Sequence, residues 1–347
     1  MASLLSALLL LGVAASPAKA TIAAWWNGIG PQILIQNATT GQIRYSACNR
    51  RDVPRYSYTD GSVLSLTYKP KIGTPLAGVG WWNEIFTIAS IFYIEESGEV
   101  ANGYFECNMS TGLFQSTGNW IISGNRLAPS IHPDTGLAAV VLGATAGYRV
   151  YYHDNDGAIN ELAYTPGGDW EYLGVISNDI NNLPALAATF TDKENITVVS
   201  ARDDSNIALT RYNKDETWHR ATIPRALKGN LTNSETNLSP IALNETARPN
   251  FILPAWDGTP SGLGISLDKN SARTLWYIGN DTRLYSVVGH EKNDTWELAA
   301  NQSSAFWPLA DEPNGPLAVA YESSSSKVRV YYMVNGQLSE IKYEGGS

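Results

Sequence analysis

Alternating apolar and polar positions around sharp turns dominate the chain, and the alternation is clearest between Tyr148 and Trp170. The segment YRVYYHDNDGAINELAYTPGGDW predicts two aromatic-rich strands folded back at a turn in which Asp156-Gly157 favours a tight hairpin. Near the C-terminus, KVRVYYMVNGQLSEIKYEGG repeats this pattern around an Asn-Gly turn. Two distant copies of one hairpin indicate a repeat architecture.

Weaker copies of the same unit extend along the rest of the chain. Each copy begins with an apolar strand, usually of small residues, and six such openings occur: TIAAWW, PLAGVGWW, GLAAVVLG, ALAATFTD, NFILPAWDG and PLAVAYE. The turns that follow place one residue of each copy at the same repeat position, about 48 to 77 residues apart: Gly41, Gly98, Gly157, Ser205, Thr282 and Gly336. The longest interval contains a polar segment, about 226–247, which we interpret as an exposed loop insertion.

Six units of three or four short strands, with no helical period, predict an all-β fold, a six-bladed β-propeller spanning residues 21–347 as a single domain. One blade cannot bury both of its faces alone, so neighbouring blades stack around a central channel. The last unit stops soon after Glu340, so we expect the strand near Ala23 to complete the final blade. A pair of β-sandwiches explains the alternation equally well, but not the recurring order of apolar strand, turn and Trp.

The first twenty residues, MASLLSALLLLGVAASPAKA, predict a cleaved signal peptide, because the apolar run is too short to span a membrane. No later stretch is apolar enough to cross a bilayer. Secretion is also favoured by nine sequons for N-glycosylation, at Asn37, Asn108, Asn195, Asn230, Asn237, Asn244, Asn280, Asn293 and Asn301. Outside the cell, Cys48 and Cys107 are expected to form a disulfide, with two buried thiols as the alternative.

Composition argues against several classes of function. The net charge of -9, the pI of about 5.0 and the lack of a Lys/Arg cluster disfavour a nucleic-acid partner. The four His and two Cys lack the spacing of metal ligands, and we expect no cofactor. The sequence has neither a G-x-S-x-G nucleophile motif nor the S-x-D-x-G-x-x-W boxes of sialidase-like glycosidases, so we expect no enzymatic activity.

The candidate chemistry lies in a basic and acidic pair that recurs in the two clearest units. Arg149 and Glu161 are expected opposite each other on one face of their hairpin, and Arg329 and Glu340 repeat the pair. A guanidinium only donates hydrogen bonds and a carboxylate only accepts them, so together they can bracket the vicinal hydroxyls of a neutral sugar. An aromatic ring such as Trp170 can cover the C–H face of that sugar.

The order of RVYY, a DG or NG turn, I/L-x-E and GG-x-W resembles the fungal fucose-specific lectins of the Aleuria type, most specifically in the third and sixth units. The resemblance implies a six-bladed propeller that binds L-fucose between adjacent blades through Arg, Glu and aromatic side chains, without a metal. Carried over by position, it assigns to one site Arg149, Glu161 and Trp170, and to a second site Arg329 and Glu340, with Trp25 or Trp26 as the aromatic surface after ring closure.

The other four units depart from this pattern. At the Arg position they carry Ile33, Ser90, Thr197 and Thr274, and at the Glu position Tyr45, Asn102, Leu209 and Ser286. Arg273 lies one residue out of register, which turns it to the opposite face of its strand. We therefore expect a secreted lectin of low valence for fucosylated glycans.

Four alternatives stay open. The protein can be a lectin for a different glycan, it can be a propeller that has kept its fold and lost its sugar, or it can be a glycosidase. Each Arg–Glu pair can also be a plain cross-strand salt bridge on an exposed hairpin, which needs no ligand. The sequence leaves open whether the chain forms a homodimer.

Overall fold

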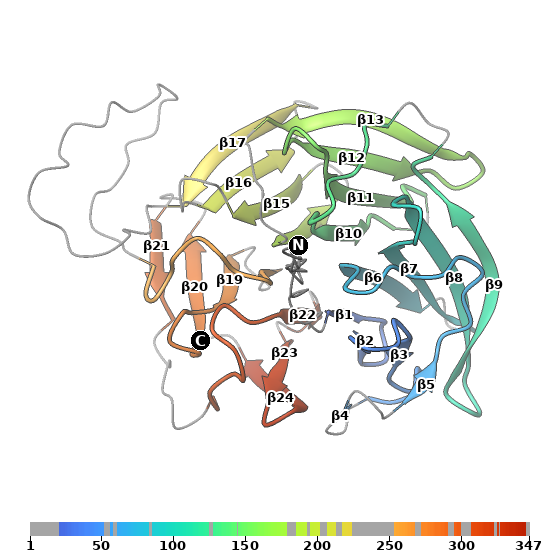
Figure 1. The fold of residues 1–347 in the computed structure, drawn as a ribbon, viewed down its shortest axis with the longest axis horizontal. Coiled ribbons are helices and arrows are strands. Elements are labelled where there is room, and N and C mark those ends of the chain that lie inside the picture. The colour runs from blue at the N-terminus through green and yellow to red at the C-terminus, as the bar shows by residue number, and fades with distance from the viewer. Residues whose placement is uncertain are drawn as a thin grey trace, which may run out of the picture.

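The computed structural model describes residues 21–344 apart from 52–55, 58–60, 83–84, 125–127, 144, 179–184, 193–194, 202–206, 213–216, 224–252, 268–271, 291–294, 300–306, 323–324 and 326 (Figure 1). The predicted signal peptide and loop insertion lie outside the described residues. So do five of the sequons, Asn230, Asn237, Asn244, Asn293 and Asn301.

Six four-stranded antiparallel sheets are arranged as blades around a ring, which confirms the predicted all-β propeller (Figure 1). Blade 1 contains β1 (Ile22–Trp26), β2 (Pro31–Gln36), β3 (Ile43–Tyr45) and β5 (Ser62–Val63). Blade 2 contains β6 (Leu76–Trp82), β7 (Thr87–Ile94), β8 (Val100–Asn108) and β9 (Leu113–Ile121). Blade 3 contains β10 (Leu137–Val141), β11 (Tyr148–His153), β12 (Ile159–Tyr164) and β13 (Trp170–Ser177).

The second half of the ring repeats this plan. Blade 4 contains β14 (Leu186–Asp192), β15 (Asn195–Ala201), β16 (Ile207–Tyr212) and β17 (Trp218–Ile223). Blade 5 contains β18 (Gly264–Leu267), β19 (Arg273–Ile278), β20 (Leu284–His290) and β21 (Thr295–Leu298). Blade 6 contains β22 (Leu317–Glu322), β23 (Lys327–Val334), β24 (Gln337–Glu344) and β4 (Tyr56–Ser57).

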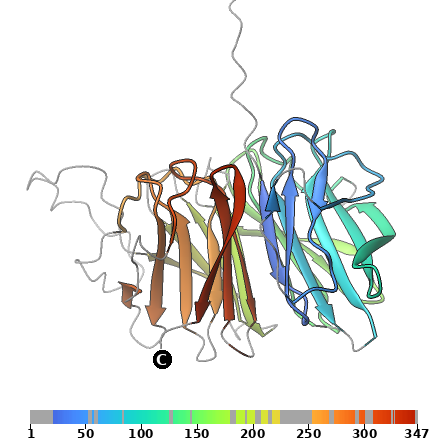
Figure 2. The ribbon, with the colours of Figure 1, turned by 90° about the horizontal axis from the view of Figure 1, so that it is seen from below.

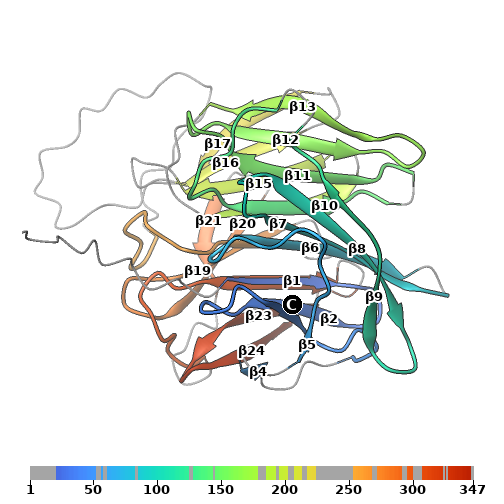
Figure 3. The same cartoon turned by 45° about the vertical axis from the view of Figure 1, so that its right-hand side comes forward.

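The strand that closes the ring differs from the one expected. The segment near Ala23 is β1, and it is the innermost strand of blade 1. The outermost strand of blade 6 is instead β4, which pairs antiparallel with β24 through Leu338–Tyr56 and Gln337–Ser57 (Figure 3). The chain therefore enters blade 1, contributes one strand to the last blade, and returns to blade 1 with β5. Backbone hydrogen bonds thereby join the two ends of the propeller.

The hairpin of blade 3 shows why these segments form strands and turns. Its turn is stabilised by Asp154, whose Oδ1 accepts hydrogen bonds from the backbone amides of Asp156 (3.0 Å) and Ala158 (2.9 Å). Gly157 follows with φ +80°, a left-handed conformation that glycine adopts without a steric cost. Asn160 Nδ2 donates to Asp154 Oδ2 at 2.8 Å, so the turn is also fastened to β12.

Alternation along each strand divides the side chains of a blade between its two neighbours. In blade 3, Val150 and Tyr152 pack towards blade 2, whereas Tyr151 and Ile159 pack towards blade 4. Because successive side chains on a strand point to opposite faces, a shift of one residue changes the blade that a side chain meets. This rule decides which residues can share a site between blades.

The innermost strands surround a cavity of about 470 Å³ on the ring axis, lined mainly by Ala, Leu, Gly and Pro. Figure 2, a side view, shows the strands running from one face of the propeller to the other. The hydroxyls of Thr189 in β14 and Tyr321 in β22 lie 2.6 Å apart and so connect blades 4 and 6 directly. Blade 5, between them, has an innermost strand of only four residues, β18.

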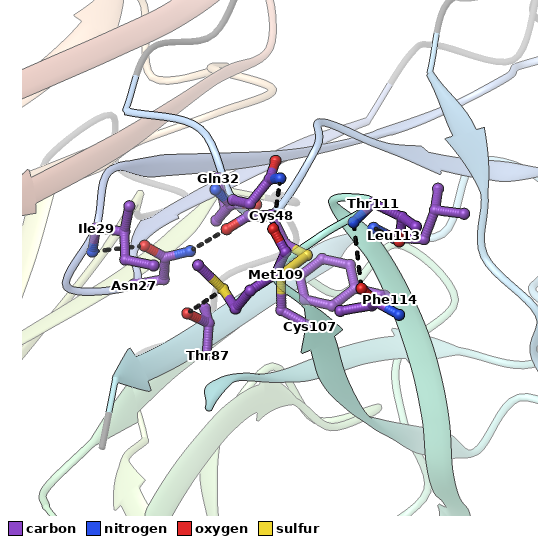
Figure 4. The surroundings of a disulfide bond; sticks show 12 residues. Asn27, Ile29, Gln32, Cys48, Thr87, Cys107, Met109, Thr111, Leu113 and Phe114 are labelled. Carbon is purple, nitrogen blue, oxygen red and sulfur yellow. Dashed lines mark hydrogen bonds between the residues drawn. A yellow bond between two sulfur atoms is a disulfide. The ribbon is translucent and has the colours of Figure 1, made fainter. Parts of the chain in front are cut away.

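A disulfide joins Cys48 of blade 1 to Cys107 of blade 2, with Cα atoms 5.9 Å apart (Figure 4). The backbone amide of Cys48 also donates to the carbonyl of Gly112 at 3.0 Å. Blade 1 has short third and fourth strands, β3 and β5, so this covalent link and its neighbouring hydrogen bond help to hold it against blade 2.

Candidate functional site

Arg149 and Glu161 form an ion pair at the junction between blades 3 and 4, with Arg149 Nε 3.5 Å from Glu161 Oε1. The two side chains are 19% and 7% exposed, so this is no surface salt bridge on an open hairpin. The Arg149 Nη1 atom also donates to the backbone carbonyls of Tyr148 (2.8 Å) and Ala146 (3.2 Å), which fixes the guanidinium in place. The pair is thus largely buried and rigidly positioned.

Two further side chains contact the carboxylate. The Tyr151 hydroxyl donates to Glu161 Oε1 at 3.1 Å, and the indole of Trp218 on β17 of blade 4 also hydrogen-bonds Glu161. Tyr151 and Trp218 meet edge to face with ring centroids 5.9 Å apart. Arg149, Tyr151, Glu161 and Trp218 together are called the Arg149 site below.

Burial controls the protonation of this carboxylate. Removal from water raises the pKa of Glu161 to about 7, although the Arg149 charge and the hydrogen bonds from Tyr151 and Trp218 act in the opposite direction. The pKa of Tyr151 is raised as well, because its ring is buried beside the Glu161 charge. Tyr151 therefore remains a hydrogen-bond donor, while Glu161 can change charge near neutral pH.

The register differs slightly from the expected one. Glu161 pairs directly with Tyr151, and Arg149 pairs with Ala163. Arg149 and Glu161 are therefore diagonal neighbours on the same face. The long guanidinium side chain spans this diagonal, as is usual for pairs two residues apart across a ladder. Tyr151 had not been considered at the sequence level, although the RVYY motif in both hairpins contains this Tyr.

The structure does not bring Trp170 to Arg149 and Glu161. Trp170 pairs with Tyr164, and Tyr164 pairs with Tyr148, so the three rings lie on the face towards blade 2. There Trp170 is 6% exposed and meets Phe92 edge to face at 5.7 Å. Tyr164 lies three positions after Glu161 on the strand, and an odd offset places the two side chains on opposite faces. The aromatic residue of the Arg149 site is the equivalent Trp of the next blade, Trp218.

Blade 6 repeats the arrangement around its own pair, which we call the Arg329 site: Arg329, Tyr331 and Glu340. Arg329 Nε lies 3.7 Å from Glu340 Oε1, and the Tyr331 hydroxyl donates to Glu340 Oε2 at 2.9 Å. Arg329 Nη1 donates to the carbonyl of Val328 at 3.0 Å. Lys342 adds a second cation, 3.7 Å from Glu340 Oε1, which the Arg149 site lacks among the described residues.

Trp25 and Trp26 lie on opposite faces of β1. Trp25 is 6% exposed and packs towards blade 2, where its ring fills the space above Gly78 and Gly80. Trp26 shares its face with Ile22 and Ala24, which pack against blade 6. Of the two, Trp26 is therefore the one directed towards the blade that holds the Arg329 site.

The remaining junctions have lost the charged pair. In blade 2, Ser90 and Asn102 occupy the two positions, and Asn102 Nδ2 donates to Ser90 Oγ at 2.7 Å. Blade 1 carries Gln32 and Tyr45; Gln32 replaces the expected Ile33 because the hairpin from Asn37 to Gln42 is one residue longer than that of blade 3.

Blades 4 and 5 carry Thr197 with Leu209, and Thr274 with Ser286, as the sequence had indicated. Arg273 does lie on the other face of its strand. It reaches back to blade 4, where Arg273 Nε donates to Thr197 Oγ1 at 2.9 Å. Two of the six junctions therefore retain the Arg–Tyr–Glu set.

Neither a metal site nor a membrane-spanning helix is found in the part of the chain that the structure describes. No group of three or more His, Cys, Asp and Glu side chains in that part is suited to hold a metal ion. No helix there has the length and apolar character needed to cross a bilayer.

Comparison with known proteins identifies the fold. No family model matches the chain, and no curated protein is significantly similar in sequence. Among solved structures, the Aleuria aurantia lectin in complex with α-methyl-L-fucoside aligns with 14% identity and a TM-score of 0.59, covering 95% of this chain and 93% of that one. AofleA from Arthrobotrys oligospora gives 14% and 0.61, covering 95% and 88%. The BP39L lectin from Burkholderia pseudomallei gives 14% and 0.58, covering 95% and 98%. The chain shares with these proteins the six-bladed propeller fold.

Proposed function

We propose that this chain is a secreted lectin that binds fucose-containing glycans at the Arg149 and Arg329 sites, without catalysis. The observation that carries the proposal is the repetition of one geometry. At two blade junctions, a guanidinium held by backbone carbonyls faces a carboxylate that also accepts a hydrogen bond from a tyrosine hydroxyl. The two sets lie at equivalent positions of different blades, so the same three residue types recur there in the same register.

The chemistry of these groups suits a neutral sugar. Arg149 supplies donors and Glu161 supplies acceptors, so adjacent hydroxyls of one ring can bond to both. Trp218 of the next blade and the apolar side chains beside it, Phe190 and Tyr212, provide a surface for the C–H face and methyl group of a deoxy sugar. The binding of α-methyl-L-fucoside by the Aleuria aurantia lectin, which has the same fold, supports fucose as the first ligand to test.

Stability alone is a weak reason for a buried ion pair. Replacing such a pair by apolar residues of similar volume is often neutral or stabilising, because two charges must be removed from water. Four junctions of this propeller are built without the pair. We therefore infer that the two that keep it do so for a ligand. The competing function is a propeller that serves as a scaffold without sugar affinity. It is favoured by the four blade junctions that lack the Arg–Glu pair.

The test is a calorimetric titration of the deglycosylated protein with methyl α-L-fucoside. We expect saturable binding to wild type at two sites, at one site after Arg149→Ala or Arg329→Ala, and at none in the double variant. The matched control is Arg283→Ala, which removes an Arg from an exposed hairpin pair with Asp281 (3.5 Å). Equal loss in the control, or no heat with wild type at millimolar sugar, contradicts the proposal.

A further inference from the structure

One end of blade 2 exposes a group of large apolar side chains. Trp82, Ile85 and Phe86 lie at the connection between β6 and β7, and Met109 and Leu113 lie at the turn between β8 and β9. Each is between 41% and 70% exposed. Apolar side chains gathered in this way on a soluble domain commonly mark a surface that something else covers.

Asn108 lies between two of these residues. The register of β8 and β9 pairs Asn108 with Leu113. The register of β7 and β8 ends at Ile88–Glu106, and Phe86 directly precedes β7, so continuing this register by two residues brings Phe86 level with Asn108. The Thr87 hydroxyl contacts Met109 Sδ at 3.6 Å, so the two segments remain together beyond the ladder (Figure 4). Asn108 and Leu113 are directly opposed and therefore share a face, and the continued register places Phe86 on that face at the other side of the amide.

The Asn108 side chain is held in one orientation. Its Oδ1 accepts hydrogen bonds from the backbone amides of Ser110 (3.0 Å) and Thr111 (3.2 Å). The Nδ2 atom lies on the other side of the planar amide group and is therefore directed away from the turn. Asn108-Met109-Ser110 is also an acceptor sequence for N-glycosylation, in which Nδ2 is the atom modified.

We propose that Asn108 carries an N-linked glycan whose first N-acetylglucosamine packs on Phe86 and Leu113. In the transfer, a bond forms from Nδ2 to C1 of the sugar, and the bond from C1 to a lipid diphosphate carrier breaks; the Nδ2 proton neutralises the departing diphosphate. A pyranose ring has an apolar C–H face that a phenyl ring and a Leu side chain can cover. The inference depends on the secretion included in the proposed function, and it is independent of sugar binding at the Arg149 site.

The glycan at Asn108 has a natural comparison in the sequon at Asn280. Asn280 is exposed at the turn between β19 and β20, next to the exposed Asp281. A glycan there extends from a polar turn, so its removal uncovers no apolar row. Ser110→Ala removes the Asn108 sequon and keeps the Asn108 side chain with its two hydrogen bonds, and Asn280→Gln removes the other sequon.

The experiment uses the full chain secreted from a eukaryotic host, with its glycans trimmed enzymatically to single N-acetylglucosamine residues. Glycopeptide mass spectrometry is expected to show Asn108 occupied. Ser110→Ala, which leaves the Asn108 hydrogen bonds in place, is expected to lower Tm by about 2 °C and to increase the fluorescence of an apolar dye, whereas Asn280→Gln does neither. In a Phe86→Ser, Leu113→Ser background, Ser110→Ala is expected to leave Tm unchanged.

Two results overturn the inference. One is an unmodified Asn108 in the secreted protein. The other is an equal fall of Tm in both backgrounds, which would mean that the glycan does not act through Phe86 and Leu113. Titration of the same samples with methyl α-L-fucoside keeps the two proposals separate, because the Ser110→Ala variants are expected to bind the sugar as wild type does.

Discussion

The Arg149 site and the junction between blades 2 and 3 occupy the same repeat position, yet the bulky side chain comes from opposite blades. At the Arg149 site, blade 3 contributes Arg149, and blade 4 places the smaller Ile196 at the facing position. At the other junction, blade 2 contributes the small Ser90, and blade 3 contributes Tyr148, which hydrogen-bonds Ser90. We call Ser90, Asn102, Tyr148 and Trp170 the Ser90 junction.

This difference shows that the space between two blades can be packed either with the Arg–Glu pair or without it. The space between two blades must be filled to the density of a protein interior. The equivalent positions hold Arg149 and Ile196 at one junction, and Ser90 and Tyr148 at the other. A buried charged pair at one junction thus corresponds to an aromatic contact between blades at the other. The Trp at the start of the outermost strand is present in both, as Trp218 and Trp170, and Trp218 hydrogen-bonds the charged Glu161.

The largest expected effect concerns these two Trp residues. Trp170→Ala is expected to lower the free energy of unfolding by about 3–5 kcal/mol, because the ring is buried among Phe92, Tyr148 and Tyr164. Trp218 is half-buried, so Trp218→Ala is expected to cost about half as much. Denaturant unfolding measures both. If both variants lose the same free energy of unfolding, the two Trp residues are packed alike and the difference described between the two junctions is wrong.

The next effect separates ligand binding from stability. Glu161→Leu copies the residue that blade 4 carries at the same position, Leu209. In an Arg329→Ala background, it is expected to weaken methyl α-L-fucoside binding at least about 100-fold, because the acceptor is lost and Arg149 is left unpaired. Asn102→Leu at the Ser90 junction is the control and is expected to leave the affinity unchanged. Calorimetry that shows both variants binding alike would refute a role for Glu161.

A smaller effect follows from the raised pKa of Glu161. With a pKa of about 7, the ionised fraction of Glu161 falls about tenfold between pH 8 and pH 6. We expect the affinity of this site to fall with it, because in the proposed complex the carboxylate accepts hydrogen bonds from the sugar. Stability changes in the other direction. The contribution of Glu161 is fully present below its unfolded pKa of about 4.5 and is lost as pH rises through about 7. Titrations of the Arg329→Ala variant with methyl α-L-fucoside at several pH values measure the change in affinity. An affinity that does not change with pH contradicts the proposed role of ionised Glu161.

The smallest effects come from two tyrosine hydroxyls. Tyr148→Phe removes the hydrogen bond to Ser90 and is expected to cost about 1 kcal/mol of stability without altering sugar affinity. Tyr151→Phe removes a hydrogen bond to Glu161 that lowers the pKa of that carboxyl. It is therefore expected to move the pH midpoint of binding upwards. A shift of this midpoint in Tyr148→Phe instead would mean that the two junctions are coupled.

Much of this structure can be predicted from the sequences of single hairpins. The alternation of Tyr148 to Tyr164, the turn around Gly157 and the matching turn at Gly336 predict strand pairs and their number along the chain. The register within a hairpin depends on the length of its turn, so most repeat positions could be assigned correctly. Gln32 was missed because one extra residue in the turn of blade 1 shifts the preceding strand.

Relations between blades were decided by tertiary structure. Trp218 rather than Trp170 meets Glu161, and β4 rather than β1 completes blade 6. Neither outcome follows from the sequence of a single hairpin. A side chain at a blade junction contacts residues of a separate sheet, and strand alternation determines which neighbouring blade it faces. The sequence by itself determined the repeat, the strands and turns, and the Arg–Glu pairs, since these depend on residues close in the chain. Packing of six sheets into a closed ring determined which aromatic residue accompanies each pair and which pairs are buried.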